Sequence, residues 1–124
     1  MSEEKKEKIV YISTVAGENP EKASLPFVLA NAALALELDA VIALQATGVY
    51  LAKKGYLENV FAAGLPPLKD LVEAFIEGGG RLLVCVPCIR ERKIDESDLI
   101  EGAEPTAAAK LTLELISADA TVTY

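Results

Sequence analysis

The stretch LKDLVEAFIEGGGRLLVCV, residues 68–86, holds a helix and a strand in direct succession. Glycines at positions 78–80 end the helix, and the apolar run after them is typical of a strand buried on both faces. A helix that leads directly into a buried strand favours a crossover connection in a parallel sheet. The helical half repeats apolar residues at the spacing of one helix face: Leu68, Leu71, Val72, Phe75 and Ile76.

The same alternation continues in both directions from this stretch. Further strands are expected at residues 8–14, 40–45 and 120–124, with a short one near 99–103. Further helices are expected at residues 19–38 and 50–59 and from Pro105 onward. We therefore predict an α/β fold, a three-layer α/β/α sandwich with a mainly parallel sheet of about five strands. Residues 1–124 are expected to form a single domain.

Two helices carry more detailed expectations. Asn19 and Pro20 are a typical cap and first residue of a helix, whereas Pro26 should delay the regular helix or kink it. The buried stripe of this helix is expected at Leu25, Val28, Leu29, Ala32, Ala33 and Leu36. In the last helix, the inward residues are expected to be Ala107, Ala108, Leu111 and Leu115.

The composition excludes several classes of function. With 12 basic and 19 acidic residues the net charge is -7, which disfavours nonspecific binding to nucleic acid or to an anionic membrane. No apolar run is long enough to span a membrane, and the charged N-terminus does not resemble a signal peptide, so we expect a cytoplasmic protein. Histidine is absent, which removes Ser-His-Asp and Cys-His mechanisms and every His-ligated metal site within the chain. No cofactor is expected.

Ligand sites of open parallel sheets lie at the carboxyl ends of the strands. Here residues 14–19, 45–50 and 86–92 should meet at that edge, and Cys85 and Cys88 fall beside or within the last of these segments. The candidate catalytic residues are therefore Cys88 and Cys85. The candidate binding residues are Thr47, Gly48, Arg90 and Arg92.

The two cysteines allow more than one interpretation. If Pro87 opens a helix, Cys88 lies in its first turn, where free N–H groups and the helix dipole stabilise a thiolate. Cys85 is expected to be more buried, and packing alone explains many cysteines in strands. The arginines are also compatible with a solvated face, and Thr47-Gly48 with a simple turn. A zinc site would need two subunits to pool their cysteine pairs, so no metal site is predicted.

A thioredoxin-like dithiol is a further interpretation of Cys85-x-x-Cys88. In that arrangement, however, the pair follows the first strand of its βαβ unit. Here the pair follows the third predicted strand. The order of elements therefore disfavours the thioredoxin fold.

The sequence resembles the DsrE/DsrF-like family, in the branch described as predicted peroxiredoxins. The likeness covers nearly the whole chain and is carried by PEKASLPFVLANAALAL (20–36), TGVYLAKKG (47–55), GLPPLKDL (64–71) and GGRLLVCVPC (79–88). Arg92-Lys93 departs from the pattern, because relatives commonly have Arg-Gly at that point.

The resemblance implies a parallel α/β/α sandwich that assembles as a trimer or hexamer. It also implies a cysteine that carries sulfur as a persulfide, as in TusD-like and DsrE-like members. Their active cysteine corresponds to Cys85, whereas helix electrostatics favour Cys88, so both remain candidates.

Three functions follow. The first is sulfur trafficking through a persulfide, between a donor and an acceptor protein, with the question of true sulfurtransferase catalysis left open. The second is a dithiol redox protein that cycles Cys85 and Cys88 through a disulfide. The third is a non-catalytic assembly subunit. Apolar residues beyond the needs of one small core predict a homo-oligomer with the cysteine loop near an interface: Leu113, Tyr50, Tyr56 and Phe61.

Overall fold

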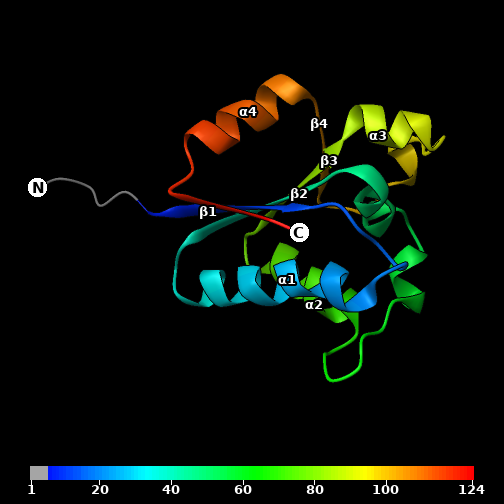
Figure 1. The fold of residues 1–124 in the computed structure, drawn as a ribbon, viewed down its shortest axis with the longest axis horizontal. Coiled ribbons are helices and arrows are strands. Elements are labelled where there is room, and N and C mark those ends of the chain that lie inside the picture. Colours follow the sequence, from blue (N-terminus) through cyan, green and yellow to red (C-terminus); the bar gives the residue numbers. More distant parts are fainter. Residues whose placement is uncertain (1–5) are drawn as a thin grey trace, which may run out of the picture.

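The structure is a computed structural model that describes residues 6–124, and its centre is a five-stranded parallel sheet. The strand order is β4-β3-β2-β1-β5, and every neighbouring pair is parallel (Figure 1). The prediction of a mainly parallel sheet of about five strands is confirmed. The strands are β1 (Lys8–Ser13), β2 (Asp39–Leu44), β3 (Arg81–Cys85), β4 (Ala103–Thr106) and β5 (Ala120–Thr123).

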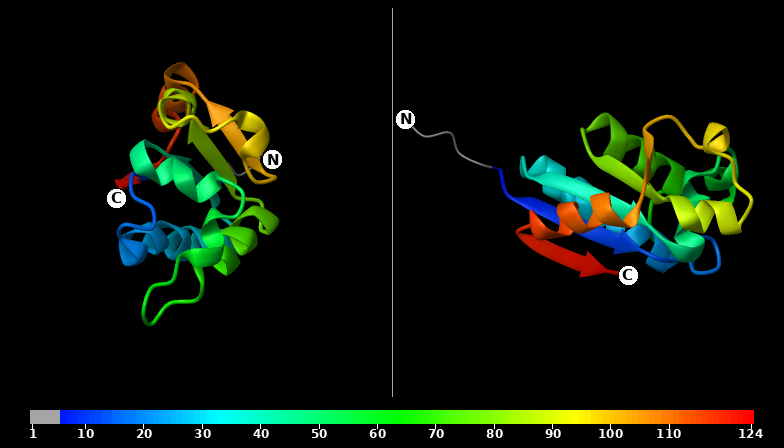
Figure 2. Two further views of the ribbon diagram at one scale, coloured as in Figure 1. Left: turned by 90° about the vertical axis from the view of Figure 1, so that its right-hand side faces the viewer. Right: turned by 90° about the horizontal axis from the view of Figure 1, so that it is seen from above.

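Helices cover both faces of this sheet, which confirms the three-layer sandwich. Helices α1 (Pro20–Ala35) and α2 (Leu68–Glu77) lie on one face, and α4 (Ala108–Ile116) lies on the other (Figures 1 and 2). The handedness of the crossovers explains which face each helix covers. From β1 to β4 each new strand is added on the same side of the previous one, and the chain then crosses back over the sheet to place β5 beside β1. Right-handed crossovers therefore put α4 opposite α1 and α2. The short helix α3 (Val86–Glu91) lies at the carboxyl edge.

The two faces of the sheet are packed unequally. The face below α1 and α2 holds the larger core, where Phe27 and Phe75 meet edge to face with ring centres 5.7 Å apart. The face below α4 buries a much smaller cluster made of Val10, Val41, Ala43 and Leu83. No residue of α4 is itself fully buried.

Helix α1 begins as predicted, but its buried face differs from the prediction. The Asn19 side chain accepts a hydrogen bond from the Lys22 N–H at 3.1 Å, and the helix starts at Pro20, so Pro26 does not delay it. The expected stripe is wrong in most of its residues: Ala33 is buried as expected, but Leu29 and Leu36 are 45% and 72% exposed. The helix is apolar almost all round, and smaller residues allow its close approach to the sheet. The buried residues are Ala23, Ser24, Pro26, Phe27, Ala30 and Ala33.

Three other elements differ from the sequence-based expectation: the helix at 50–59, the short strand at 99–103, and the last helix, which begins at Ala108 rather than at Pro105. The segment expected as one helix at 50–59 forms two 3-10 helices, η1 (Ala46–Ala52) and η2 (Tyr56–Asn59), separated by Gly55 with φ +85°. The short strand lies at β4 rather than at residues 99–103, and Pro105 is inside it. Proline is tolerated there because β4 is an edge strand that pairs only with β3. A further 3-10 turn, η3 (Glu96–Asp98), precedes β4.

Candidate functional site

The predicted ligand edge is built from the segments that follow β1, β2 and β3. The N–H of Gln45 donates to the Ser13 carbonyl at 3.0 Å, which joins the chain after β2 to the end of β1. Helix α3 packs against η1 on the other side. The ends of three neighbouring strands thus meet around the two cysteines, both of which are free and half-buried.

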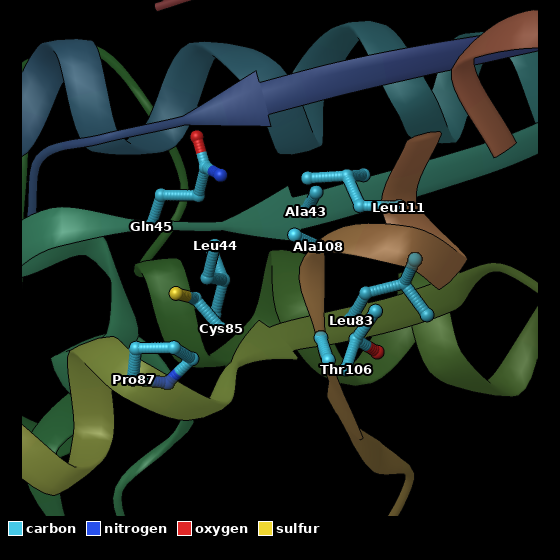
Figure 3. A pocket seen from close by; sticks show the side chains of 10 residues that line it. Ala43, Leu44, Gln45, Leu83, Cys85, Pro87, Thr106, Ala108 and Leu111 are labelled. Atoms are coloured by element: carbon cyan, nitrogen blue, oxygen red, sulfur yellow. The ribbon is translucent and has the colours of Figure 1, made fainter. Parts of the chain in front are cut away.

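Cys85 is the last residue of β3 and the N-cap of α3. Because it lies two residues after Leu83, its side chain faces the same side of the sheet, the side covered by α4. There it lines a pocket of about 90 Å³ together with Gln45, Pro87 and Thr106. Figure 3 shows the Cys85 sulfur beside Leu44, in the space between Gln45 and Pro87. The pocket is mainly apolar, so it favours an uncharged sulfur.

The surroundings of Cys85 raise its pKa. Burial is the largest cause, and the neighbouring Cys88 side chain adds to it, while the Cys88 backbone N–H and, more weakly, the charge of Arg92 oppose the shift. Cys85 therefore holds its proton more firmly than an ordinary thiol. A protonated thiol is a poor nucleophile, so this sulfur is not the better candidate for the first attack on a substrate.

Cys88 has a different environment although it lies only three residues further on. It is the third residue of α3, in the first helical turn, as the position of Pro87 in the sequence indicated. Its Sγ accepts a hydrogen bond from the Ala46 N–H at 3.3 Å. A backbone N–H directed at sulfur stabilises negative charge on it, so the contact favours the reactive form of a thiol.

Of the two candidate arginines, only Arg92 is placed close to the sulfurs. Its guanidinium donates to the Cys88 carbonyl at 3.2 Å, and its charge acts on the Cys85 thiol. Arg90 is exposed on α3, and within residues 6–124 it forms no ion pair.

Thr47 and Gly48 lie in the first turn of η1, beside the cysteines. The Thr47 hydroxyl lies 3.2 Å from the Thr14 carbonyl and also hydrogen-bonds to the Glu18 carboxylate. Gly48 packs so closely on β1 that a Cβ at this position would lie 2.5 Å from the Ser13 carbonyl oxygen. Both residues thus shape the loop that presents the Ala46 N–H.

Two residues of this site were not predicted from the sequence. Ala46 contributes through its backbone, and it does so in a left-handed conformation (φ +53°) for which alanine gives no sequence signal. Glu18 lies in the segment 14–19 that was expected at the edge, but nothing in its local sequence marks it. Its pairing with a residue 29 positions away is visible only in three dimensions.

Residues 6–124 contain no cluster of three or more Cys, Asp or Glu side chains suited to hold a metal ion. Over the same residues, none of the helices is both long and apolar enough to cross a membrane.

The fold and the site define a class: a parallel α/β protein with a cysteine pair at the carboxyl edge of the sheet. The chain belongs to the DsrE/DsrF-like family, whose model matches residues 7–124. This confirms the resemblance seen in the sequence.

Relatives in archaea support the assignment. The chain is 35% identical over 102 residues to the uncharacterised protein MJ0760 of Methanocaldococcus jannaschii, covering 82% of this chain and 37% of that protein. The chain therefore spans little more than a third of that relative. It is also 33% identical to the uncharacterised protein MJ0989 of the same organism, covering 94% of this chain and 99% of that one.

Solved structures agree on the fold. The ychN protein from E. coli matches with a TM-score of 0.75 at 17% identity, over 97% of this chain and 100% of that chain. The protein MTH1491 from Methanobacterium thermoautotrophicum matches with a TM-score of 0.67 at 12% identity, again over 97% and 100%. At these identities the likeness concerns the fold alone.

Proposed function

We propose that this protein carries sulfane sulfur as a persulfide, with Cys88 as the first acceptor and Cys85 as its partner. The observation that carries the proposal is the hydrogen bond from the Ala46 N–H to the Cys88 sulfur, in the first turn of α3. Membership of the DsrE/DsrF-like family, commonly associated with sulfur relay, supports the same chemistry.

The transfer needs neither a metal nor an external oxidant. The Cys88 thiolate attacks the outer sulfur of a donor persulfide, a new S–S bond forms at Cys88, and the donor S–S bond breaks. The donor leaves as a thiolate, which takes up a proton from water. In the second half, an acceptor thiolate attacks the outer sulfur of the Cys88 persulfide, and Cys88 leaves as a thiolate.

Cys85 has a different part in this scheme. Its raised pKa keeps it protonated near neutral pH, so it does not compete for the donor. It lies beside Cys88 and lines the apolar pocket between β3 and α4. The relay members of the family place their active cysteine at Cys85, so single variants are needed to assign the carrier.

Mass spectrometry of the intact, unreduced protein tests this proposal. After incubation with glutathione persulfide, the parent protein should gain about 32 Da, the mass of one sulfur atom. Cys85→Ser should retain the gain and Cys88→Ser should lose it. If Cys88→Ser kept the mass gain and Cys85→Ser lost it, the carrier would be Cys85. No gain in any of the three proteins, each shown to be folded, would refute the proposal.

A second candidate function is dithiol redox chemistry, and the closeness of the two thiols favours it. Here the Cys88 thiolate attacks a substrate disulfide, and Cys85 then attacks the mixed disulfide and releases the second substrate thiol. The substrate gains two electrons and the protein forms a Cys85–Cys88 disulfide. The intact mass would fall by about 2 Da, a result opposite in sign to persulfide loading.

A further inference from the structure

We propose that Glu18 and Thr47 are positioning residues, which hold Ala46 in the conformation that directs its N–H at the Cys88 sulfur. Both lie outside the cysteine motif, on the segments that follow β1 and β2. The link to sulfur transfer rests on the function proposed above. The positioning of the N–H does not rest on it.

Ala46 adopts a backbone conformation that it would not choose alone. Its φ of +53° lies in the left-handed region, which is unfavourable for a residue with a Cβ. Such a conformation persists only where the surroundings determine it, and strained residues of this kind cluster at functional sites. Here its consequence is visible: the Ala46 N–H points out of the loop and reaches Cys88 Sγ at 3.3 Å.

The restraint on Ala46 comes from both sides. On its N-terminal side, the Gln45 N–H donates to the Ser13 carbonyl at 3.0 Å. On its C-terminal side, the Gly48 N–H donates to the Gln45 carbonyl at 2.9 Å. Gly48 itself is wedged against the Ser13 carbonyl, where a side chain would not fit. These backbone contacts fix the course of the loop but do not hold the adjacent Thr47 side chain.

Thr47 is held by Glu18, with the Thr14 carbonyl 3.2 Å from its hydroxyl as a second acceptor. The Thr47 hydroxyl bonds to one carboxylate oxygen of Glu18, and the other oxygen accepts the Ala16 N–H at 2.9 Å. The Glu18 pKa is lowered, first by the Thr47 hydrogen bond, so the carboxylate stays charged and accepting at neutral pH. A continuous path of contacts therefore runs from the end of β1 through Glu18 and Thr47 to Ala46 and Cys88.

The path bears on reactivity because a sulfur anion gains more from an N–H than a neutral thiol does. If the loop becomes more mobile, the Cys88 thiolate loses the stabilisation that the Ala46 N–H provides, whereas the neutral thiol is affected little. The expected effect is a higher pH midpoint of Cys88 alkylation and a rate at neutral pH lower by about threefold to tenfold, a typical value for weakening one charge-assisted hydrogen bond.

The test uses the Cys85→Ser protein, in which Cys88 is the only thiol, and measures alkylation by iodoacetamide against pH. Thr47→Val should raise the midpoint and slow the reaction, and Thr47→Ser, which keeps the hydroxyl, should restore both. Glu18→Ala should shift the midpoint in the same direction as Thr47→Val but by less, since the Thr14 carbonyl remains as an acceptor for the Thr47 hydroxyl. Glu18→Gln keeps an acceptor oxygen and should stay close to the parent. The matched control is Glu21→Gln, an exposed carboxylate in the first turn of α1.

The comparison of Glu18 variants separates positioning from simple charge. If Glu18 acted only through its negative charge, both Glu18 variants would lower the midpoint equally, and that result would overturn the proposal. An unchanged midpoint in Thr47→Val, with the fold intact by circular dichroism, would also overturn it. If Thr47→Val does not fold, the comparison of Glu18→Ala with Glu18→Gln tests the proposal instead. Persulfide loading is measured separately, so its absence in the parent would refute the proposed function and leave the alkylation result standing.

Discussion

At the scale of single residues, the site depends on where a strand becomes a helix. Cys85 still follows the alternation of β3 and faces α4, whereas Cys88 follows the geometry of α3 and faces η1. Two thiols three residues apart thereby acquire different surroundings. One is desolvated beside an apolar pocket, and the other accepts a backbone N–H.

The Cys85 thiol should titrate above the ordinary thiol value of 9.0, because burial is the main cause of its raised pKa. In Cys88→Ser, which leaves Cys85 as the only thiol, alkylation should therefore reach half its maximal rate at a pH above that value. The burial effect survives this substitution, although the smaller contribution of the Cys88 side chain is lost. Stopped-flow alkylation against pH measures the midpoint, and a value below 9.0 would contradict the assignment of Cys85 as the protonated partner.

Gly48→Ala should destabilise the protein more than Gly55→Ala. At Gly48 the new Cβ would lie 2.5 Å from the Ser13 carbonyl oxygen, so β1 or η1 must move. At Gly55 the space is open, and only the left-handed φ of +85° penalises alanine, by about 1 kcal/mol. We expect about 2–3 kcal/mol for Gly48→Ala, an overpacking cost. Urea denaturation measures the free energy of unfolding of both variants. Equal losses of stability would show that the loop moves to accommodate the new Cβ at little cost.

The sequence was informative about the two cysteines of this site and uninformative about the loop contacts that surround them. The position of Cys85 and Cys88 at the sheet edge followed from apolar patterning and from Pro87. The role of Ala46 could not be predicted, because alanine has no preference for the left-handed region. Glu18 could not be predicted either, since its partner Thr47 is reached only after β1 and β2 pair.

At the scale of elements, α4 is attached to the sheet by charges as much as by apolar contacts. None of its side chains is fully buried, and only Leu111 and Leu115 pack on the small second cluster. Glu114 bonds to Lys8 on β1 and to Arg81 on β3, each at 2.8 Å, and its side chain is only 11% exposed. One carboxylate thus bridges α4 to two strands.

Glu114→Gln should destabilise the protein by about 1.5–3 kcal/mol, the range for hydrogen bonds to charged groups. Burial alone would raise the Glu114 pKa, but the bonds from Lys8 and Arg81 outweigh it and the pKa is lowered. A lowered pKa means that this stabilisation is complete above the ordinary value of 4.5 and is lost as the pH falls through the folded value.

Urea denaturation at fixed protein concentration, at neutral pH and in acid, measures this difference. The gap in unfolding free energy between parent and Glu114→Gln should narrow in acid. The matched control is Glu77→Gln, an exposed carboxylate at the end of α2, which should change stability little at either pH. A gap that does not depend on pH would mean that the bridge is not ionic.

Patterning predicted the elements best where one face is strongly apolar. Helix α2 and its stripe were predicted correctly because apolar and polar faces are well separated there. Helix α1 is apolar nearly all round, so periodicity could not identify its buried face. Pro105 was misassigned because proline marks helix starts and edge strands alike, and only the pairing of β4 with β3 separates the two.

At the scale of the whole molecule, both faces of the sandwich leave large apolar side chains exposed, but they differ in how much apolar core lies beneath them. The α1 and α2 side encloses a full core beneath its exposed groups, whereas the α4 side covers only a small cluster and presents Leu113 and Ile116, 68% and 79% exposed. Exposed apolar groups on a helix that covers little core are typical of interaction surfaces, and so is the open edge of a sheet, which β5 provides. We therefore expect the predicted homo-oligomer to use the α4 and β5 side.

Light scattering coupled to size exclusion, at micromolar protein, should give a mass that is a multiple of the 13.2 kDa chain, with a trimer or hexamer expected. The double variant Leu113→Asp with Ile116→Asp should shift this mass toward the monomer, because charge is costly to bury at an apolar interface. Since both side chains are largely exposed within one chain, the far-ultraviolet circular dichroism should not change. Leu36→Asp, an equally exposed position at the end of α1, is the matched control and should keep the parent mass. Loss of assembly in Leu36→Asp alone would move the interface to the opposite face of the sheet, and a monomeric parent would refute self-association.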